Sequence, residues 1–223
     1  MHRWLFVVIL AACFPCRLFP ASVCMPGSLA SYQALGATGC MVGELLVNDF
    51  SFGVGLFGGG VTPIDSTQIT VTPNGGAGFL GLRFSSPGFS VTGSEFVNYA
   101  IGYTWDPTGD IRGLGDLLDP GVVDVVTNGC VGVAFSGSFC GGTPVSVHVF
   151  TGPTSQSDTV FFPETGVLGI RNNISLNANG ATAGIDRFLE NDAYIPEPAS
   201  LILIAVGLIV LKMVGQAWRP TLL

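Results

Sequence analysis

Few side chains in this sequence could act as a nucleophile or a general base. Only two histidines occur, and His148 is the one that lies away from the N-terminus. It alternates with Val147 and Val149, which is typical of a strand whose imidazole faces the exposed side. Ser146 shares that side, but a serine and a histidine two residues apart are common in strands. We therefore interpret His148 as a partly exposed strand residue and expect no enzyme activity.

Acidic side chains offer a second kind of chemistry, because they concentrate in one stretch of the chain. This stretch holds Asp106, Asp110, Asp116, Asp119 and Asp124. A pair of carboxylates could cleave a glycosidic bond, and Asp106, Asp110 and Asp116 could bind calcium together with backbone carbonyls. Their spacing differs from that of an EF-hand, and the Pro and Gly residues between them are typical of turns. We expect turn formation and solubility as the main role, with a calcium site as the alternative.

Aromatic side chains could stack against a sugar ring. Tyr99, Tyr103 and Trp105 alternate along one predicted strand and share one face. Alternating aromatics on a strand are more often part of a core, so the core is the favoured interpretation and a sugar platform the alternative.

The charge balance excludes one class of function. Residues 22–195 hold four arginines, no lysine and fourteen acidic residues, which leaves a net charge of −10. Nucleic-acid binding needs clustered cations that displace counterions from phosphates. We therefore expect no nucleic-acid partner.

The elements that must position these residues are predicted to be strands. Short apolar or alternating runs recur between Gly, Pro, Asn and Asp, and helical periodicity is nearly absent before the C-terminal tail. Residues 68–72 and 78–84 are expected to form a hairpin around a turn at 73–76, and Asn128-Gly129 predicts a second tight turn. Nine or ten strands with no helices between them predict an all-β domain over 22–193, an antiparallel β-sandwich or jelly roll.

Residues 22–195, which we call the exported region because a signal peptide is predicted before them, contain four cysteines that can form two disulfides. Pairing by proximity gives Cys24–Cys40 near the N-terminus and Cys130–Cys140 around a short turn. Three connectivities are possible, and the local one is favoured. Zinc is a poor alternative, because no closely spaced cysteine pair and only one histidine occur in this region.

The N-terminus has the pattern of a secretory signal peptide over residues 1–21. A short basic segment precedes an apolar run at 4–14, which is too short to span a membrane. Signal peptidase is expected to cut after Ala21, following export through the Sec translocon. The alternative is a lipoprotein that is lipidated at Cys13, but this would leave Cys16 as an odd thiol.

The last 30 residues, 194–223, carry the most specific pattern. Pro196, Glu197 and Pro198 precede an apolar stretch at about 199–218, which is long enough for one transmembrane helix. Lys212 and Arg219 lie near its end and are expected on the cytoplasmic side. This order of triplet, apolar helix and basic end resembles the PEP-CTERM sorting signal.

The resemblance implies a route through the cell envelope. Proteins with this signal are substrates of an exosortase, which recognises the tail in the inner membrane and processes the protein for the cell surface or extracellular matrix. The opening at 24–32, with Cys40 and the pattern Asn48-x-Phe50-x-Phe52, is similar to uncharacterised PEP-CTERM proteins of soil acidobacteria, which implies no known activity. Because this sorting system accompanies exopolysaccharide production, we expect a non-enzymatic, matrix-associated protein. A carbohydrate-binding or calcium-dependent adhesion module is the alternative.

Overall fold

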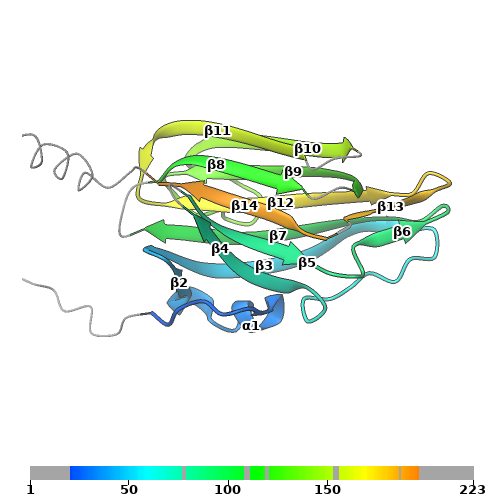
Figure 1. Cartoon of the computed structure of the whole chain (residues 1–223), viewed down its shortest axis with the longest axis horizontal. Coiled ribbons are helices and arrows are strands. Elements are labelled where there is room, and N and C mark those ends of the chain that lie inside the picture. Colours follow the sequence, from blue (N-terminus) through cyan, green and yellow to red (C-terminus); the bar gives the residue numbers. More distant parts are fainter. Residues whose placement is uncertain are drawn as a thin grey trace, which may run out of the picture.

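The computed structural model describes residues 21–76, 79–107, 111–118, 121–152, 156–185 and 187–195. Within these ranges the chain forms an antiparallel β-sandwich, as predicted, with fourteen strands in two sheets (Figure 1). No helix of the described part is long and apolar enough to cross a membrane. The predictions for Cys13, Asp110, Pro196, Glu197, Pro198, Lys212, Arg219 and a membrane helix at about 199–218 fall outside the described residues.

Six strands form the first sheet. In order across the sheet they are β1 (Gly27–Ser28), β4 (Thr70–Gly76), β5 (Phe79–Ser85), β14 (Leu189–Tyr194), β8 (Ile111–Leu118) and β11 (Gln156–Thr165). Strands far apart in the sequence pair at its centre, because β14 lies between β5 and β8.

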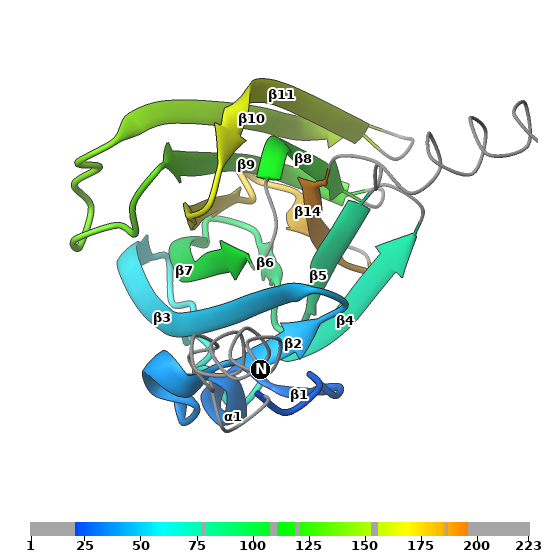
Figure 2. The ribbon, with the colours of Figure 1, turned by 90° about the vertical axis from the view of Figure 1, so that its left-hand side faces the viewer.

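Eight strands form the second sheet. Seven of them follow the order β2 (Cys40–Val42), β3 (Leu45–Gly58), β7 (Phe96–Pro107), β12 (Leu168–Asn177), β9 (Gly121–Val131), β13 (Thr182–Ile185) and β6 (Ser90–Thr92). The eighth, β10 (Thr143–Gly152), pairs with β9. Figure 2 shows the sandwich end-on, with β3 and β7 facing β4 and β5 across the core.

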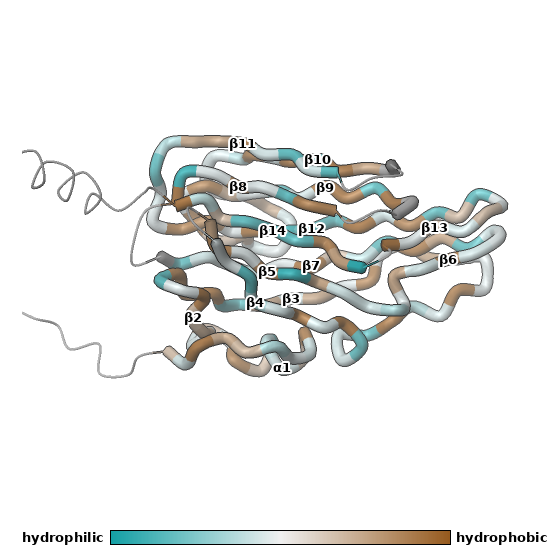
Figure 3. The backbone as a smooth tube through the Cα atoms, viewed as in Figure 1, coloured by the Kyte–Doolittle hydropathy of each residue, from teal (hydrophilic) through white to brown (hydrophobic). Residues whose placement is uncertain are grey.

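The core lies between the two sheets, where alternate residues of each strand point inward. Apolar and polar residues alternate along the strands accordingly (Figure 3). Tyr99 and Tyr103 are buried and Trp105 is fully buried, so the core interpretation is confirmed and the sugar platform at these residues is wrong. Tyr103 packs against Trp105 at 5.9 Å between ring centroids, which is a range favourable for aromatic pairs.

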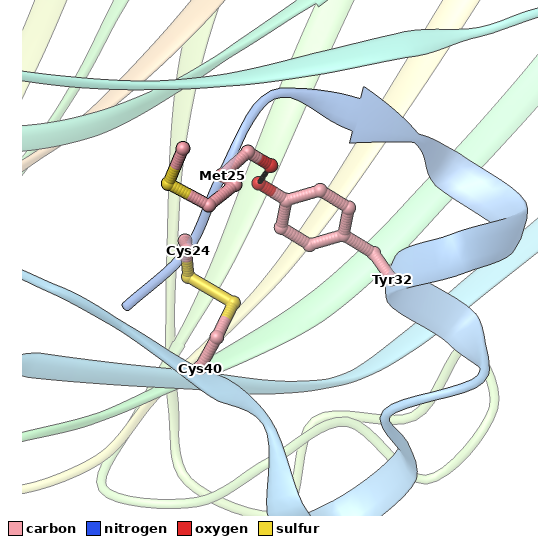
Figure 4. The surroundings of a disulfide bond; sticks show 4 residues. All are labelled: Cys24, Met25, Tyr32 and Cys40. Carbon is pink, nitrogen blue, oxygen red and sulfur yellow. Dashed lines mark hydrogen bonds between the residues drawn. A yellow bond between two sulfur atoms is a disulfide. The ribbon is translucent and has the colours of Figure 1, made fainter. Parts of the chain in front are cut away.

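A short helix, which the sequence did not predict, covers the edge of the sandwich where β1 and β2 lie (Figure 2). Helix α1 (Leu29–Gln33) begins after Ser28, whose hydroxyl accepts from the backbone N–H of Ser31, and a 3-10 turn η1 (Gly36–Thr38) follows. The Cys24–Cys40 disulfide holds this segment to β2, as predicted, and the Tyr32 hydroxyl donates to the Met25 carbonyl beside it (Figure 4).

Both predicted tight turns are wrong. Residues 73–76 all belong to β4, and Gly76 pairs with Phe79, so the chain reverses between these two residues. Asn128 and Gly129 lie inside the continuous strand β9. Gly129 sits beneath Val145, where an added Cβ would approach the valine methyl to 2.7 Å. Close packing between strands therefore explains this glycine better than turn formation does.

Candidate functional site

An open groove of about 510 Å³ lies on the outer face of the eight-stranded sheet. Strands β3, β7 and β12 form its floor and one wall. The loop that connects β9 to β10 forms the other wall, and in Figure 2 this loop lies outside the sandwich beside β3 and β7. The volume falls within the range of roughly 300–1,000 Å³ that is typical of small-molecule sites.

The groove is deep because the residues on its floor have small side chains. Ser51, Gly102 and Arg171 form one row across β3, β7 and β12, and Gly53 and Ala100 form the next row. A Cβ at Gly102 would lie 2.5 Å from the Ser51 hydroxyl oxygen, so even alanine would displace that side chain. The groove therefore depends on residues that present little more than backbone to solvent.

One wall is shaped by a β-bulge. The pairing of β3 with β7 shifts register between Asn48 and Ser51, and Asp49 inside the bulge is exposed and has a φ of 54°. This left-handed conformation is costly for residues other than glycine, though aspartate tolerates it better than most. Bulges often redirect side chains beside functional sites. Here the bulge places Asp49 on the lining of the groove.

Three kinds of contact fix the opposite wall to the sheet. The predicted Cys130–Cys140 disulfide closes the loop. Backbone hydrogen bonds tie the loop to the start of β12, among them one of 3.3 Å from the Gly169 N–H to the Val133 carbonyl. Arg171 Nη1 donates to the Gly137 carbonyl at 3.1 Å. We infer that the wall is held in place before any ligand binds.

A second hollow, of about 330 Å³, lies on the other side of this loop. Phe135, Ser138 and Arg171 border both hollows, and Asn128 and Asn173 line only the second. Arg171 Nε also donates to Asn173 Oδ1 at 3.4 Å. The guanidinium thus lies at the centre of one polar surface, with Asp49 as a carboxylate acceptor and serine hydroxyls between them.

Two of the three predicted calcium ligands, Asp106 and Asp116, are described by the structure, and they lie in different sheets. Asp106 is partly exposed in β7, whereas Asp116 is only 2% exposed and belongs to β8 in the other sheet. The turn interpretation is therefore wrong for Asp116. No group of three His, Cys, Asp or Glu side chains that could hold a metal occurs among the described residues. The calcium hypothesis stays a prediction.

Asp116 instead lies at one end of a buried network of hydrogen-bonded polar side chains that crosses the core. Asn191 donates through Nδ2 to Asp116 Oδ1 at 2.8 Å. The Asn191 carbonyl oxygen accepts from Asn172 at 2.7 Å and from the Tyr103 hydroxyl at 3.0 Å. The Thr127 hydroxyl donates to Asn172 Oδ1 at 2.5 Å. Because these residues come from β7, β8, β9, β12 and β14, the network joins the two sheets.

Burial raises the pKa of Asp116 to about 7, and the negative charge of Asp158 acts in the same direction. The hydrogen bond that Asn191 donates to the carboxylate opposes this rise. Asp116 Oδ2 has no hydrogen-bond partner among the described residues, which suits a protonated oxygen that donates. Thr127 can accept that proton because its own hydroxyl hydrogen goes to Asn172.

His148 lies where the sequence predicted it. Its side chain is 51% exposed on β10, and Nε2 lies 2.5 Å from Asp124 Oδ1 of the neighbouring strand. The prediction that the chain has no enzyme activity stays a prediction.

Comparisons with known proteins leave the family open. No protein-family model and no curated protein matches this chain. The solved structure of TmCBM61 in complex with beta-1,4-galactotriose is similar at a TM-score of 0.34 and 16% identity, over 63% of this chain and 86% of that one. The enzymatically active domain of tailspike protein 4 from bacteriophage CBA120 is similar at a TM-score of 0.33 and 11% identity, over 69% of this chain and 19% of that one. Neither likeness is close enough to carry an argument about a ligand.

Proposed function

We propose that this chain is an exported surface or matrix protein that binds a short saccharide segment in the groove between β3 and the loop after β9. The observation that carries the proposal is the groove itself, with a low floor of small residues, a polar lining and a wall fixed by a disulfide. Because this wall is already rigid, the protein loses little conformational entropy when a ligand binds in the groove.

The polar lining has the hydrogen-bonding groups that a saccharide needs. Arg171 supplies N–H donors in a planar fork, and the Asp49 carboxylate accepts from hydroxyl groups. Ser51 and Ser138 can donate and accept, and Phe135 adds a partly exposed ring for the apolar face of a sugar. The described lining holds no histidine or cysteine and one carboxylate, which favours binding over catalysis.

The route to the cell surface rests on the two ends of the sequence. The segment 1–21 directs Sec export, and the Pro196-Glu197-Pro198 triplet with its apolar segment is the substrate of an exosortase in the inner membrane. Two disulfides in the exported region are typical of proteins that fold in an oxidising compartment. The groove and this route together support the proposed association with exopolysaccharide.

Binding is tested by screening the exported region on an array of bacterial polysaccharide fragments, followed by calorimetry with the best ligand. Arg171→Gln and Asp49→Asn should each weaken binding about tenfold or more, which corresponds to the loss of one charge-assisted hydrogen bond. Ala100→Leu should block the groove without touching the core. Arg112→Gln is the matched control, since it removes an exposed arginine from the other sheet. Unchanged affinity in the Ala100→Leu variant would show that the ligand binds elsewhere.

Sorting is tested by intact-mass and terminal-peptide mass spectrometry of the native protein. A start at Ser22 and an end between Pro196 and Pro198 support exosortase processing. An acylated Cys13 with a tail that ends at Leu223 would support the lipoprotein alternative instead.

A further inference from the structure

A row of aromatic side chains crosses the outer face of the six-stranded sheet. Phe79, Tyr194, Gly113 and Phe161 are successive register partners on β5, β14, β8 and β11. The ring of Tyr194 lies 6.5 Å from that of Phe79 and 5.5 Å from that of Phe161, measured between centroids. We call Phe79, Tyr194 and Phe161 the aromatic row.

The absence of a side chain at Gly113 explains how the rings fit together, but it does not explain why they are exposed. A Cβ at Gly113 would lie 2.8 Å from Cδ1 of Phe161 and 3.1 Å from Cβ of Tyr194, so the glycine makes room for both side chains. Even so, Phe161 remains 66% exposed, and Phe79 and Tyr194 are only partly buried. Adjacent exposed aromatics of this kind mark a contact surface more often than isolated ones do.

The aromatic row lies at the end of the sandwich where the described chain stops. Tyr194 is the last residue of β14, and this end lies at the left of Figure 1 and faces the viewer in Figure 2. The apolar segment of the sequence starts at Ala199, five residues later. Five residues span at most about 18 Å even when fully extended.

We infer that the aromatic row rests on the lipid headgroups of the membrane while the C-terminal segment is still attached. The inference rests on the proposed membrane anchoring of the precursor. If the segment that starts at Ala199 enters the hydrocarbon core, Tyr194 lies within about 18 Å of that core. The headgroup layer takes up about 5–7 Å of this distance on each side of a bilayer. The end of the sandwich that bears the row is therefore held within about 11–13 Å of the headgroup layer at most, which is close enough for the row to contact it.

The chemistry of the row suits a headgroup layer. Phenylalanine, tyrosine and tryptophan carry large apolar area, and tyrosine adds a hydroxyl for the wet side of the interface. Charge does not drive this contact, because the exported region has a net charge of −10 and Arg112 beside the row pairs with Glu164 at 2.6 Å. Contact is therefore expected with zwitterionic lipid and should resist salt.

The experiment uses the full chain in phosphatidylcholine nanodiscs that carry a nitroxide on the headgroup. Trp4 and Trp218 are replaced by Phe, and Phe161→Trp places a fluorophore in the row. The matched control is Leu56→Trp, an exposed site (76%, against 66% for Phe161) near the C-terminal end of β3, at the end of the sandwich opposite the row. Buried Trp105 is common to both variants. We expect the nitroxide to quench the Phe161→Trp variant at least twofold more strongly than the control.

The outcomes separate this inference from the anchoring on which it rests. A parent chain that keeps Trp218 reports directly on insertion of the tail. Quenching of Trp218 without excess quenching of Phe161→Trp would overturn the contact and leave anchoring intact. Absence of quenching at Trp218 would overturn both. Phe79→Trp repeats the test at the other end of the row if Phe161→Trp does not fold.

Discussion

Replacing Asp116 with asparagine should change how the stability of the sandwich depends on pH. Burial raises the pKa of this carboxyl to about 7 from an ordinary value of 3.8. Between these values the folded chain keeps a proton that the unfolded chain has already released. Unfolding then releases a proton, so the free energy of unfolding falls as pH rises from about 4 to 7 and is level above 7.

The magnitude follows from the size of the shift. One titrating proton changes stability by about 1.4 kcal/mol per pH unit, so Asp116 alone should account for a loss of about 3 kcal/mol between pH 5 and pH 8. Asp116→Asn keeps the shape of the neutral acid and can donate to Thr127. If the amide makes the same contacts as the neutral acid, the variant should exceed the wild type in stability by about 2 kcal/mol at pH 5, and by about 3 kcal/mol more than that at pH 8.

Urea unfolding followed by circular dichroism from pH 5 to pH 8 measures this slope. A smaller slope should survive in Asp116→Asn, because burial and the charge of Glu190 also raise the pKa of Asp192. The pKa of Asp65 is lowered by hydrogen bonds with Thr67, so this residue changes the free energy of unfolding only below about pH 4. Asp106→Asn removes an aspartate outside the network and should keep the wild-type slope. A wild type whose stability is constant or rises over this range would refute the argument.

Three further variants test the packing, the groove wall and the core. Gly129→Ala should lower stability by about 1–3 kcal/mol, measured by thermal unfolding, because its Cβ would approach Val145 to 2.7 Å. Replacing Cys130 and Cys140 by serine should cost about 3 kcal/mol in urea unfolding and weaken saccharide binding more than the Cys24–Cys40 double variant does. Tyr99→Phe removes the acceptor of a buried backbone N–H at 3.2 Å and should cost about 1–3 kcal/mol, also measured by urea unfolding.

The strands and the disulfides could be predicted because their signals are local. Alternation of apolar and polar residues marks a strand whatever its partner, and each cysteine pair lies close in sequence, 16 and 10 residues apart. The errors arose where tertiary packing overrides a local preference. Asn128-Gly129 is a strong turn signal, but Gly129 is needed beneath Val145. Asp116 has the neighbours of a loop residue, but its carboxyl completes a network that joins both sheets.

The groove could not be predicted, because its residues become neighbours only through sheet register. Ser51, Gly102 and Arg171 lie far apart in the sequence and meet in one row of three strands. None of them stands out alone, since a serine, a glycine and an arginine are ordinary on an exposed strand face. The positive φ of Asp49 and the bulge beside it likewise depend on the pairing of β3 with β7.

The positions of the groove and the aromatic row have a consequence for the order of events at the cell surface. The groove opens on the outer face of the eight-stranded sheet, and the row lies on the outer face of the six-stranded sheet. Because these faces point in opposite directions, a chain that rests on the membrane through the row keeps the groove open to solvent. Cleavage at Pro196–Pro198 would free the row and leave the groove unchanged. Saccharide affinity should therefore be the same before and after processing, and only the place where the ligand is held should change.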